Sequence, residues 1–126
     1  FIFFTGLDIS KNSTSERTSA IFEAEYYIKN NSINSCIIRP GVVIGEGDQF
    51  LRRLLPIIKI SFFVPIFGKG KSKLQPVYVD DVAKAVEQII SSKLKGCHIF
   101  ELVGSETFTY RSFYLYLIKC LKVKRF

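Results

Sequence analysis

The order of apolar and polar residues along the chain predicts alternating strands and helices. Phe1–Phe4 is a short, uninterrupted apolar run, which is typical of a buried parallel strand, and a Thr-Gly pair ends it. Ser13 and Glu16 have the spacing of a capping box, so a helix is expected to begin there and to end at Asn30–Asn31. The expected buried face of this helix consists of Ala20, Ile21, Ala24, Tyr27 and Ile28.

The middle of the chain continues the alternation and then departs from it. Cys36–Ile38 is a second short strand, which a proline closes because proline cannot donate to a ladder. Asp48 is placed to cap a helix over Gln49–Ile60. Beyond it, Val64–Phe67 and Gln75–Val79 flank a turn rich in glycine and lysine. They predict a small hairpin or a pair of excursion strands.

The last third of the chain returns to helices and a strand. Asp80 is expected to cap a helix, His98–Val103 to form a strand, and Thr109 to start a final helix. The apolar positions of the first of these helices are Val82, Ala83, Val86, Ile89 and Ile90. Taken together, the order of strands and helices is typical of a parallel, doubly wound α/β sheet with a small β excursion, in one domain or part of one.

The composition is that of a folded chain. Of 126 residues, 12 are Phe and 6 are Tyr, more than is typical of a chain that cannot bury apolar surface. The sequence contains no methionine, and its first strand has no preceding cap or turn. We therefore expect it to be a fragment of a longer protein.

The net charge of +7 does not by itself indicate a nucleic-acid partner. The basic residues gather in Lys69–Lys73 and in Lys122–Phe126, without interleaved aromatics or a known nucleic-acid motif. This distribution favours a solvated surface, and no nucleic-acid partner is expected.

Cysteine usage and hydropathy exclude further classes. The 3 cysteines are widely spaced, which indicates a reducing compartment. Because His98 is the only histidine, no metal site is expected. The apolar stretch Leu54–Phe67 is broken by two prolines and a lysine and is too short to span a bilayer.

Three motifs in this order resemble one family. Arg39–Asp48 (RPGVVIGEGD) is similar to the segment that follows the sixth strand of extended and atypical short-chain dehydrogenase/reductases, the NAD-dependent epimerase/dehydratase family. Gln75–Ala83 (QPVYVDDVA) and Phe100–Thr109 (FELVGSETFT) resemble later segments of the same proteins. The residues of the second motif are most similar to those of the atypical branch, which includes the nucleotide-binding accessory subunit of respiratory complex I and its bacterial relatives.

This resemblance implies a fold, a cofactor and binding residues. The chain would be the C-terminal, substrate-side part of a Rossmann domain, and the Gly-rich βαβ unit that holds the cofactor pyrophosphate would lie upstream of Phe1. NAD or NADP would belong to the intact parent, not to this fragment alone. The implied cofactor-binding residues are Thr5, Pro40, Gly41, Val42 and Val43. The implied substrate pocket contains Phe50, Lys73, Gln75 and Tyr78.

The catalytic residues of the family are missing from the matching positions. The family uses a Tyr as acid/base and a Lys four residues later, on one helix face, with a Ser or Thr on the preceding strand. Thr5 stands at the Ser position, but with the helix anchored on Glu25, Arg17 and Ile21 replace Tyr and Lys. No Tyr-x-x-x-Lys occurs anywhere in the chain. Leu74 stands where sugar-nucleotide epimerases place a phosphate-binding arginine.

Several polar residues also have purely structural interpretations. Arg39 is expected to make a structural ion pair or to bind a carbonyl, not to contact a ligand. Asp80 and Asp81 are expected to be cap and surface residues, and Tyr78 to belong to the core or a pocket wall.

The main hypothesis is a catalytically degenerate NAD(P)-binding protein with a role in nucleotide binding or assembly. Its partners would be the missing N-terminal half or another chain, and possible sites are respiratory complex I or a membrane surface, on the cytoplasmic or matrix side. An active epimerase, dehydratase or reductase with a displaced acid/base residue stays open, as does a non-functional product of a split reading frame.

The apolar stretch Leu54–Phe67 has two interpretations of its own. It is a pocket wall or, with Phe62 and Phe63 as anchors and basic neighbours, a surface that docks on a membrane complex or a bilayer.

NAD(P) is not expected to bind measurably to these 126 residues alone, because the helix N-terminus that holds the pyrophosphate belongs to the upstream unit. Calorimetric titration with NADH tests this. Micromolar binding would contradict it and would mean that the cofactor site has been placed wrongly.

The isolated chain is expected to fold poorly or to associate. Phe1–Phe4 would form an apolar strand with one unpaired edge, and such edges pair with other chains. Light scattering and NMR of the isolated chain test this expectation. A strictly monomeric sample with a sharply dispersed spectrum counts against it.

Overall fold

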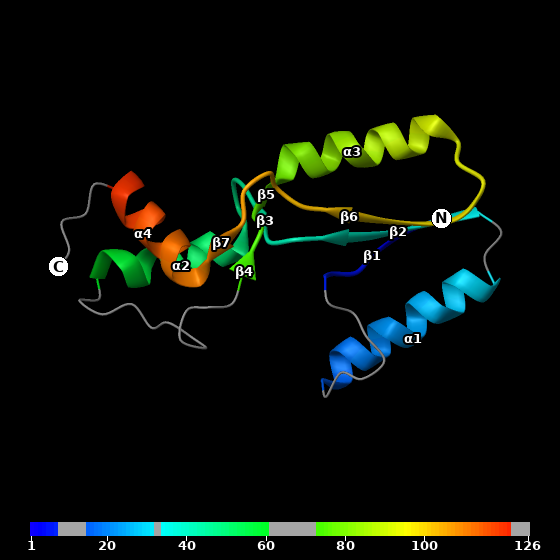
Figure 1. Cartoon of the computed structure of the whole chain (residues 1–126), viewed down its shortest axis with the longest axis horizontal. Coiled ribbons are helices and arrows are strands. Elements are labelled where there is room, and N and C mark those ends of the chain that lie inside the picture. The colour runs from blue at the N-terminus through cyan, green and yellow to red at the C-terminus, as the bar shows by residue number, and fades with distance from the viewer. Residues whose placement is uncertain (8–14, 32–33, 61–72, 122–126) are drawn as a thin grey trace.

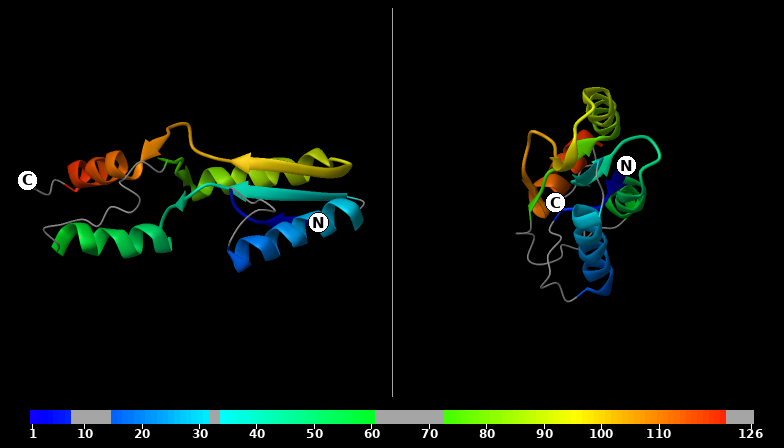
Figure 2. Two further views of the ribbon diagram at one scale, coloured as in Figure 1. Left: turned by 60° about the horizontal axis from the view of Figure 1, so that its bottom comes forward. Right: turned by 90° about the vertical axis from the view of Figure 1, so that its right-hand side faces the viewer.

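The computed structural model describes residues 1–7, 15–31, 34–60 and 73–121, and these form an elongated molecule with two lobes (Figures 1 and 2). The first lobe is a three-stranded parallel sheet with strand order β1-β2-β6, covered by α1 on one face and α3 on the other. Its elements are β1 (Ile2–Phe4), α1 (Glu16–Asn31), β2 (Asn34–Pro40), α3 (Val79–Ser92) and β6 (Gly96–Leu102). The predicted α/β architecture with a parallel sheet is confirmed.

The second lobe joins two helices to two short strand pairs. Its elements are β3 (Val43–Ile44), α2 (Gln49–Ile60), β4 (Lys73–Leu74), β5 (Val77–Tyr78), β7 (Phe108–Thr109) and α4 (Tyr110–Cys120). β3 pairs with β5 in parallel, and β4 pairs with β7 antiparallel. The core of this lobe is a cluster of buried residues from β4, α2 and α4: Leu54, Ile58, Leu74, Phe113, Tyr114 and Leu117.

Local capping signals place the two helices of the second lobe. Both carboxylate oxygens of Asp48 accept backbone N–H groups, one from Leu51 at 2.7 Å and the other from Gly45 at 3.0 Å. Thr109 caps α4 through a reciprocal capping box with Ser112. Both predicted helix starts are therefore confirmed, because one side chain satisfies a backbone donor that the helix leaves open.

The excursion is described only in part. Gln75–Val79 contains β5, an excursion strand that pairs in parallel with β3, and Val64–Phe67, the other predicted strand, lies outside the described residues. Asp80 is not the cap of α3. Tyr78 occupies the N-cap position without a side-chain hydrogen bond, and Asp80 and Asp81 are exposed in the first turn. The strand pairing of Val77 and Tyr78 runs directly into the helix, so no residue is left between them for a side-chain cap.

The first strand is parallel, as predicted, but it is not buried. β1 lies at one edge of the sheet, and Phe1 and Phe4 are 72% and 50% exposed. Its only hydrogen-bonded neighbour among the described strands is β2, so its apolar side chains lack a second strand to pack against. The expectation of an unpaired apolar edge holds for the described residues.

Helix α1 ends where predicted and buries part of the predicted face: Ile28 is buried, and Ile21 and Ala24 are partly buried. Its predicted cap, Ser13, lies outside the described residues, and the helix begins at Glu16. Ala20 and Tyr27 are exposed, whereas Glu25 and Ile28 are buried. The apolar pattern was misleading here because a charged residue, Glu25, has its partners on the sheet.

Glu25 forms a buried ion pair with Arg39 of β2. The carboxylate is 1% exposed and accepts two hydrogen bonds from the guanidinium, from Nε to Oε1 at 3.1 Å and from Nη2 to Oε2 at 2.5 Å. Arg39 also lies 3.9 Å from the exposed Glu101. The prediction that Arg39 makes a structural ion pair is confirmed, and the bidentate contact ties α1 to the centre of the sheet.

Burial and partners act on the pKa of Glu25 in opposite directions. Burial raises it, but the hydrogen bonds from Arg39 and Thr5 and the positive charge of Arg39 lower it, and the net pKa lies below the ordinary value of 4.5. Arg39 has its pKa raised, chiefly by the hydrogen bond to Glu25, so it stays protonated. A carboxyl group with a lowered pKa stabilises the fold above pH 4.5, and this contribution disappears as the pH falls through the lowered pKa.

Replacing Glu25 by Gln in the intact protein is expected to lower the free energy of unfolding by about 3 kcal/mol, because Arg39 loses its buried counter-charge. Urea unfolding at neutral pH measures this loss, and the deficit should shrink below pH 4.5 as the native carboxyl group protonates.

The matched control is Glu23→Gln, which removes the same charge from the exposed side of α1. It is expected to change the free energy of unfolding by less than about 0.5 kcal/mol. Equal effects of the two substitutions would contradict a structural role for the ion pair.

Candidate functional site

The carboxyl ends of β1, β2 and β6 meet at one edge of the parallel sheet, where ligands bind in folds of this kind. The N–H of Thr5 donates to the carbonyl of Ile38 at 2.9 Å, and the N–H of Gly41 donates to the carbonyl of Leu102 at 2.9 Å. In Figure 1 this edge lies in the middle of the molecule, between the two lobes. The structure therefore brings Thr5 and Pro40–Gly41 to the same sheet edge.

Thr5 uses its hydroxyl hydrogen inside the protein. Thr5 Oγ1 donates to Glu25 Oε1 at 2.7 Å, the same carboxylate that pairs with Arg39. A hydroxyl has a single hydrogen, so in this arrangement Thr5 can accept a hydrogen bond from a ligand but has none to donate to a carbonyl.

The two replaced catalytic positions lie on α1 in the register that Glu25 defines. Ile21 is one turn before Glu25 and half-buried, and Arg17 is two turns before it and exposed. Ile21 has no charge, and an arginine does not release a proton near neutral pH. The described part of this face therefore supplies no acid/base pair of the family's type.

The Pro40–Val43 segment is held through its backbone. The carbonyl of Val42 accepts from the N–H of Val77 at 2.9 Å, and Val43 pairs with Val77 in the second lobe. A Cβ at Gly41 would lie 2.6 Å from the backbone oxygen of Gln75. The missing side chain at Gly41 thus makes room for Gln75, and the segment connects the main sheet to the excursion.

The backbone directly after Thr5 carries no side chain. No atom of the described residues stands within 4 Å of the position that a Cβ would take at Gly6. This is the end of β1 at which the nicotinamide side of an NAD(P) site would lie, and the sequence contains no Gly-rich phosphate loop.

The four residues expected in the substrate pocket lie in different surroundings. Phe50 packs against Phe113 of the second-lobe core, with ring centroids 6.0 Å apart. Lys73 is exposed on β4, and Gln75 places its backbone against Gly41. Tyr78, 49% exposed, is a wall of a surface cavity that the other three do not line. The anchors Phe62 and Phe63 lie outside the described residues.

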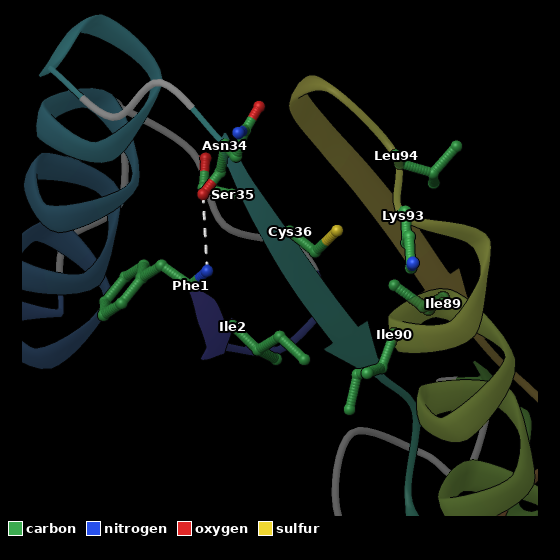
Figure 3. Close-up of a pocket in the computed structure, with 9 residues that line it drawn as sticks. All are labelled: Phe1, Ile2, Asn34, Ser35, Cys36, Ile89, Ile90, Lys93 and Leu94. Atoms are coloured by element: carbon green, nitrogen blue, oxygen red, sulfur yellow. Dashed lines mark hydrogen bonds between the residues drawn. The ribbon is translucent and has the colours of Figure 1, made fainter.

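A second hollow lies at the opposite end of the sheet (Figure 3). It has a volume of about 220 Å³ and lies between the amino ends of β1 and β2 and the end of α3. The Cys36 thiol points toward the helix residues Ile89 and Lys93 in this view. Because it is at the amino ends of the strands, this hollow is not the ligand edge of a parallel sheet.

Two further properties bear on the kind of site. Within the described residues, no group of three or more His, Cys, Asp or Glu side chains could hold a metal ion. None of the described helices is long and apolar enough to cross a bilayer.

Glu25 is the residue whose role the sequence did not reveal. In the sequence, Glu25 only aligned this helix with the matching helix of the family. Arg39 was expected to form an ion pair, but its partner was not identified. Two signals were available: Glu25 is a charge between apolar neighbours on α1, and Arg39 is the only charge in β2. Together they point to a pair across the helix–sheet interface.

Comparison with known proteins agrees with the fold. The family model described as "NAD dependent epimerase/dehydratase family" matches residues 17–102. Mitochondrial NADH dehydrogenase (ubiquinone) 1 alpha subcomplex subunit 9 of Arabidopsis thaliana is 35% identical over 106 residues, which are 82% of this chain and 26% of that protein. The mitochondrial 40 kDa subunit of NADH-ubiquinone oxidoreductase of Neurospora crassa is 27% identical over 86% of this chain and 28% of its own length. The chain thus spans only about a quarter to a third of these relatives.

Solved structures share the architecture at low sequence identity. A dTDP-4-dehydrorhamnose reductase of Clostridium acetobutylicum matches with a TM-score of 0.80 and 14% identity, over 99% of this chain and 48% of its own. UDP-glucuronic acid 4-epimerase of Bacillus cereus, in complex with UDP-glucuronic acid and NAD, matches with a TM-score of 0.74 and 19% identity, over 99% of this chain and 46% of its own. The motifs, the sheet and the family model agree: this chain belongs to the NAD dependent epimerase/dehydratase family.

Proposed function

We propose that this chain is the substrate-side part of an NAD(P)-binding protein that has lost catalysis and serves as an accessory subunit in an assembly like respiratory complex I. The observation that carries the proposal is the hydrogen bond from Thr5 to Glu25. In the family this hydroxyl orients a substrate. Here its hydrogen is donated to a buried carboxylate that is itself paired with Arg39.

The helix face beside Thr5 supports the same conclusion. An acid/base catalyst needs a group that can exchange a proton near the working pH, within hydrogen-bond reach of the substrate. Arg17 and Ile21 meet neither requirement. A bound nucleotide in the intact protein would then stabilise the fold or the assembly, because a ligand that binds only the native state adds to its stability.

The nucleotide would contact the carboxyl edge of the sheet. We assign its nicotinamide side to Thr5, Pro40, Gly41, Val42 and Val43, with Gly6 providing the open space. The phosphates and the adenosine would lie on a Gly-rich βαβ unit that precedes these residues. NAD or NADP supplies redox chemistry when bound to an active enzyme, and in this protein it would serve as a structural ligand.

The names of the relatives support the proposed partner subunits and the proposed location in the cell. Two of them are mitochondrial subunits of NADH-ubiquinone oxidoreductase or its 1 alpha subcomplex. We therefore propose a matrix-side position, peripheral to the inner membrane, with the neighbouring subunits as partners.

The intact protein is expected to bind NADH without turning it over. Gly6→Val should weaken NADH binding at least about tenfold, because the valine fills the open space beside Thr5. NADH fluorescence measures the affinity, and NADH absorbance measures turnover.

Ala83→Val is the matched control, since it adds a side chain of similar size on the exposed side of α3. It should leave NADH binding unchanged. Turnover that disappears in Arg17→Ala would show that the site is catalytic and would overturn the proposal. Unchanged binding in Gly6→Val would instead remove the nucleotide from this edge.

A further inference from the structure

An acidic, aromatic cavity opens on the surface near the junction of the lobes, where β5 and β7 lie between the beginnings of α3 and α4 (Figure 1). Its volume is about 440 Å³, and its walls come from β5, α3, the loop after β6 and α4. Tyr78, Asp81, Glu106, Phe108 and Tyr116 line it. The residues assigned to the nucleotide, Thr5 and Pro40–Val43, do not line it, but the cavity adjoins the sheet edge through Ile44 and Val103, which directly follow Val43 and β6.

The charge of the cavity is opposite to that of the chain. The sequence has a net charge of +7, yet the cavity contains two carboxylates, Asp81 and Glu106. Within the described residues both ion pairs belong to Arg39, and neither Asp81 nor Glu106 is in one. Lys84 and Arg111 on the adjoining helices are exposed and leave these carboxylates unpaired.

Aromatic rings form the rest of the cavity, and packing holds them in place. The ring of Phe108 packs edge-on against Phe113, with centroids 5.4 Å apart, and lies tilted against Tyr116, with centroids 5.8 Å apart. Tyr78 and Tyr116 stand at the opening and are 49% and 52% exposed. The pKa of Tyr116 is raised, first by its hydrogen bond with Cys120 and to a smaller degree by Glu106. Its hydroxyl therefore stays protonated and can form hydrogen bonds.

We propose that this cavity is a docking site for an arginine side chain of a partner protein. A guanidinium is flat and delocalised, donates to two carboxylates at once and stacks on aromatic faces, which are the groups present here. Its apolar stem suits the phenylalanine floor. Tyrosines at the opening extend the contact surface, as tyrosine and arginine do at the centres of protein interfaces. The proposal is independent of the nucleotide role.

The test uses the intact protein and three peptides: acetyl-glycyl-arginyl-glycine amide, its lysine analogue, and its citrulline analogue, which has the shape of the arginine peptide without the charge. Saturation-transfer NMR titrations are expected to show the arginine peptide binding at least about tenfold more tightly, the effect of one charge-assisted hydrogen bond. The double variant Asp81→Asn/Glu106→Gln should reduce arginine binding to the citrulline level. The lysine peptide should bind more weakly than the arginine peptide.

Asp80→Asn is the matched control, because it removes the same charge from the same turn of α3 outside the cavity lining. It should leave binding unchanged. If the double variant unfolds, as judged by circular dichroism, Tyr116→Ala takes its place and should also weaken arginine binding. Equal binding of arginine and citrulline peptides, equal binding of the lysine peptide, or an equal loss in Asp80→Asn would overturn the proposal.

Discussion

The buried carboxylate of Glu25 is the group on which the arrangement of the sheet edge depends. It accepts hydrogen bonds from a threonine after β1 and from an arginine in β2, while it belongs to α1 itself. Removing a carboxylate from water costs several kcal/mol, and only well-placed partners offset that cost. The position of α1 on the sheet is therefore fixed by three polar groups, and the loss of Arg39 would leave the carboxylate of Glu25 buried without its counter-charge.

The same network determines what the edge can do chemically. Thr5 follows the strand that would hold a catalytic hydroxyl, and α1 has the two positions that would hold its acid/base partners. In this chain the hydroxyl of Thr5 stabilises the fold through its hydrogen bond to Glu25. The side chains at the two α1 positions have no proton that they can exchange near neutral pH. The fold of the family is kept, while the two α1 positions hold Arg17 and Ile21.

Much of the fold could be predicted because several signals are local. Asp48 and Thr109 cap their helices with hydrogen bonds to residues three positions away, and both were found from spacing alone. Apart from the cap of α3, which was placed at Asp80 and lies at Tyr78, the failures concern partners distant in sequence. Nothing in Gln75–Val79 shows that it pairs with β3, and nothing in α1 shows that Tyr27 faces solvent. Such features depend on which surface another segment covers. The candidate site shares this limit: Thr5 lies at the end of β1, as the strand pattern predicted, but its contact with Glu25 became visible only in the structure.

The two lobes also differ in how they bury apolar surface, and this bears on what the chain needs from its surroundings. The second lobe closes a cluster of aromatic and aliphatic residues between α2 and α4. In the sheet lobe, Phe4, Ile90 and Ile99 are 50%, 60% and 40% exposed on three different elements. Exposed apolar groups that lie on both edge strands and on a covering helix indicate contact with further structure. A lobe that relies on a buried ion pair and leaves its sheet edges apolar gains stability from whatever binds there, whether nucleotide or protein.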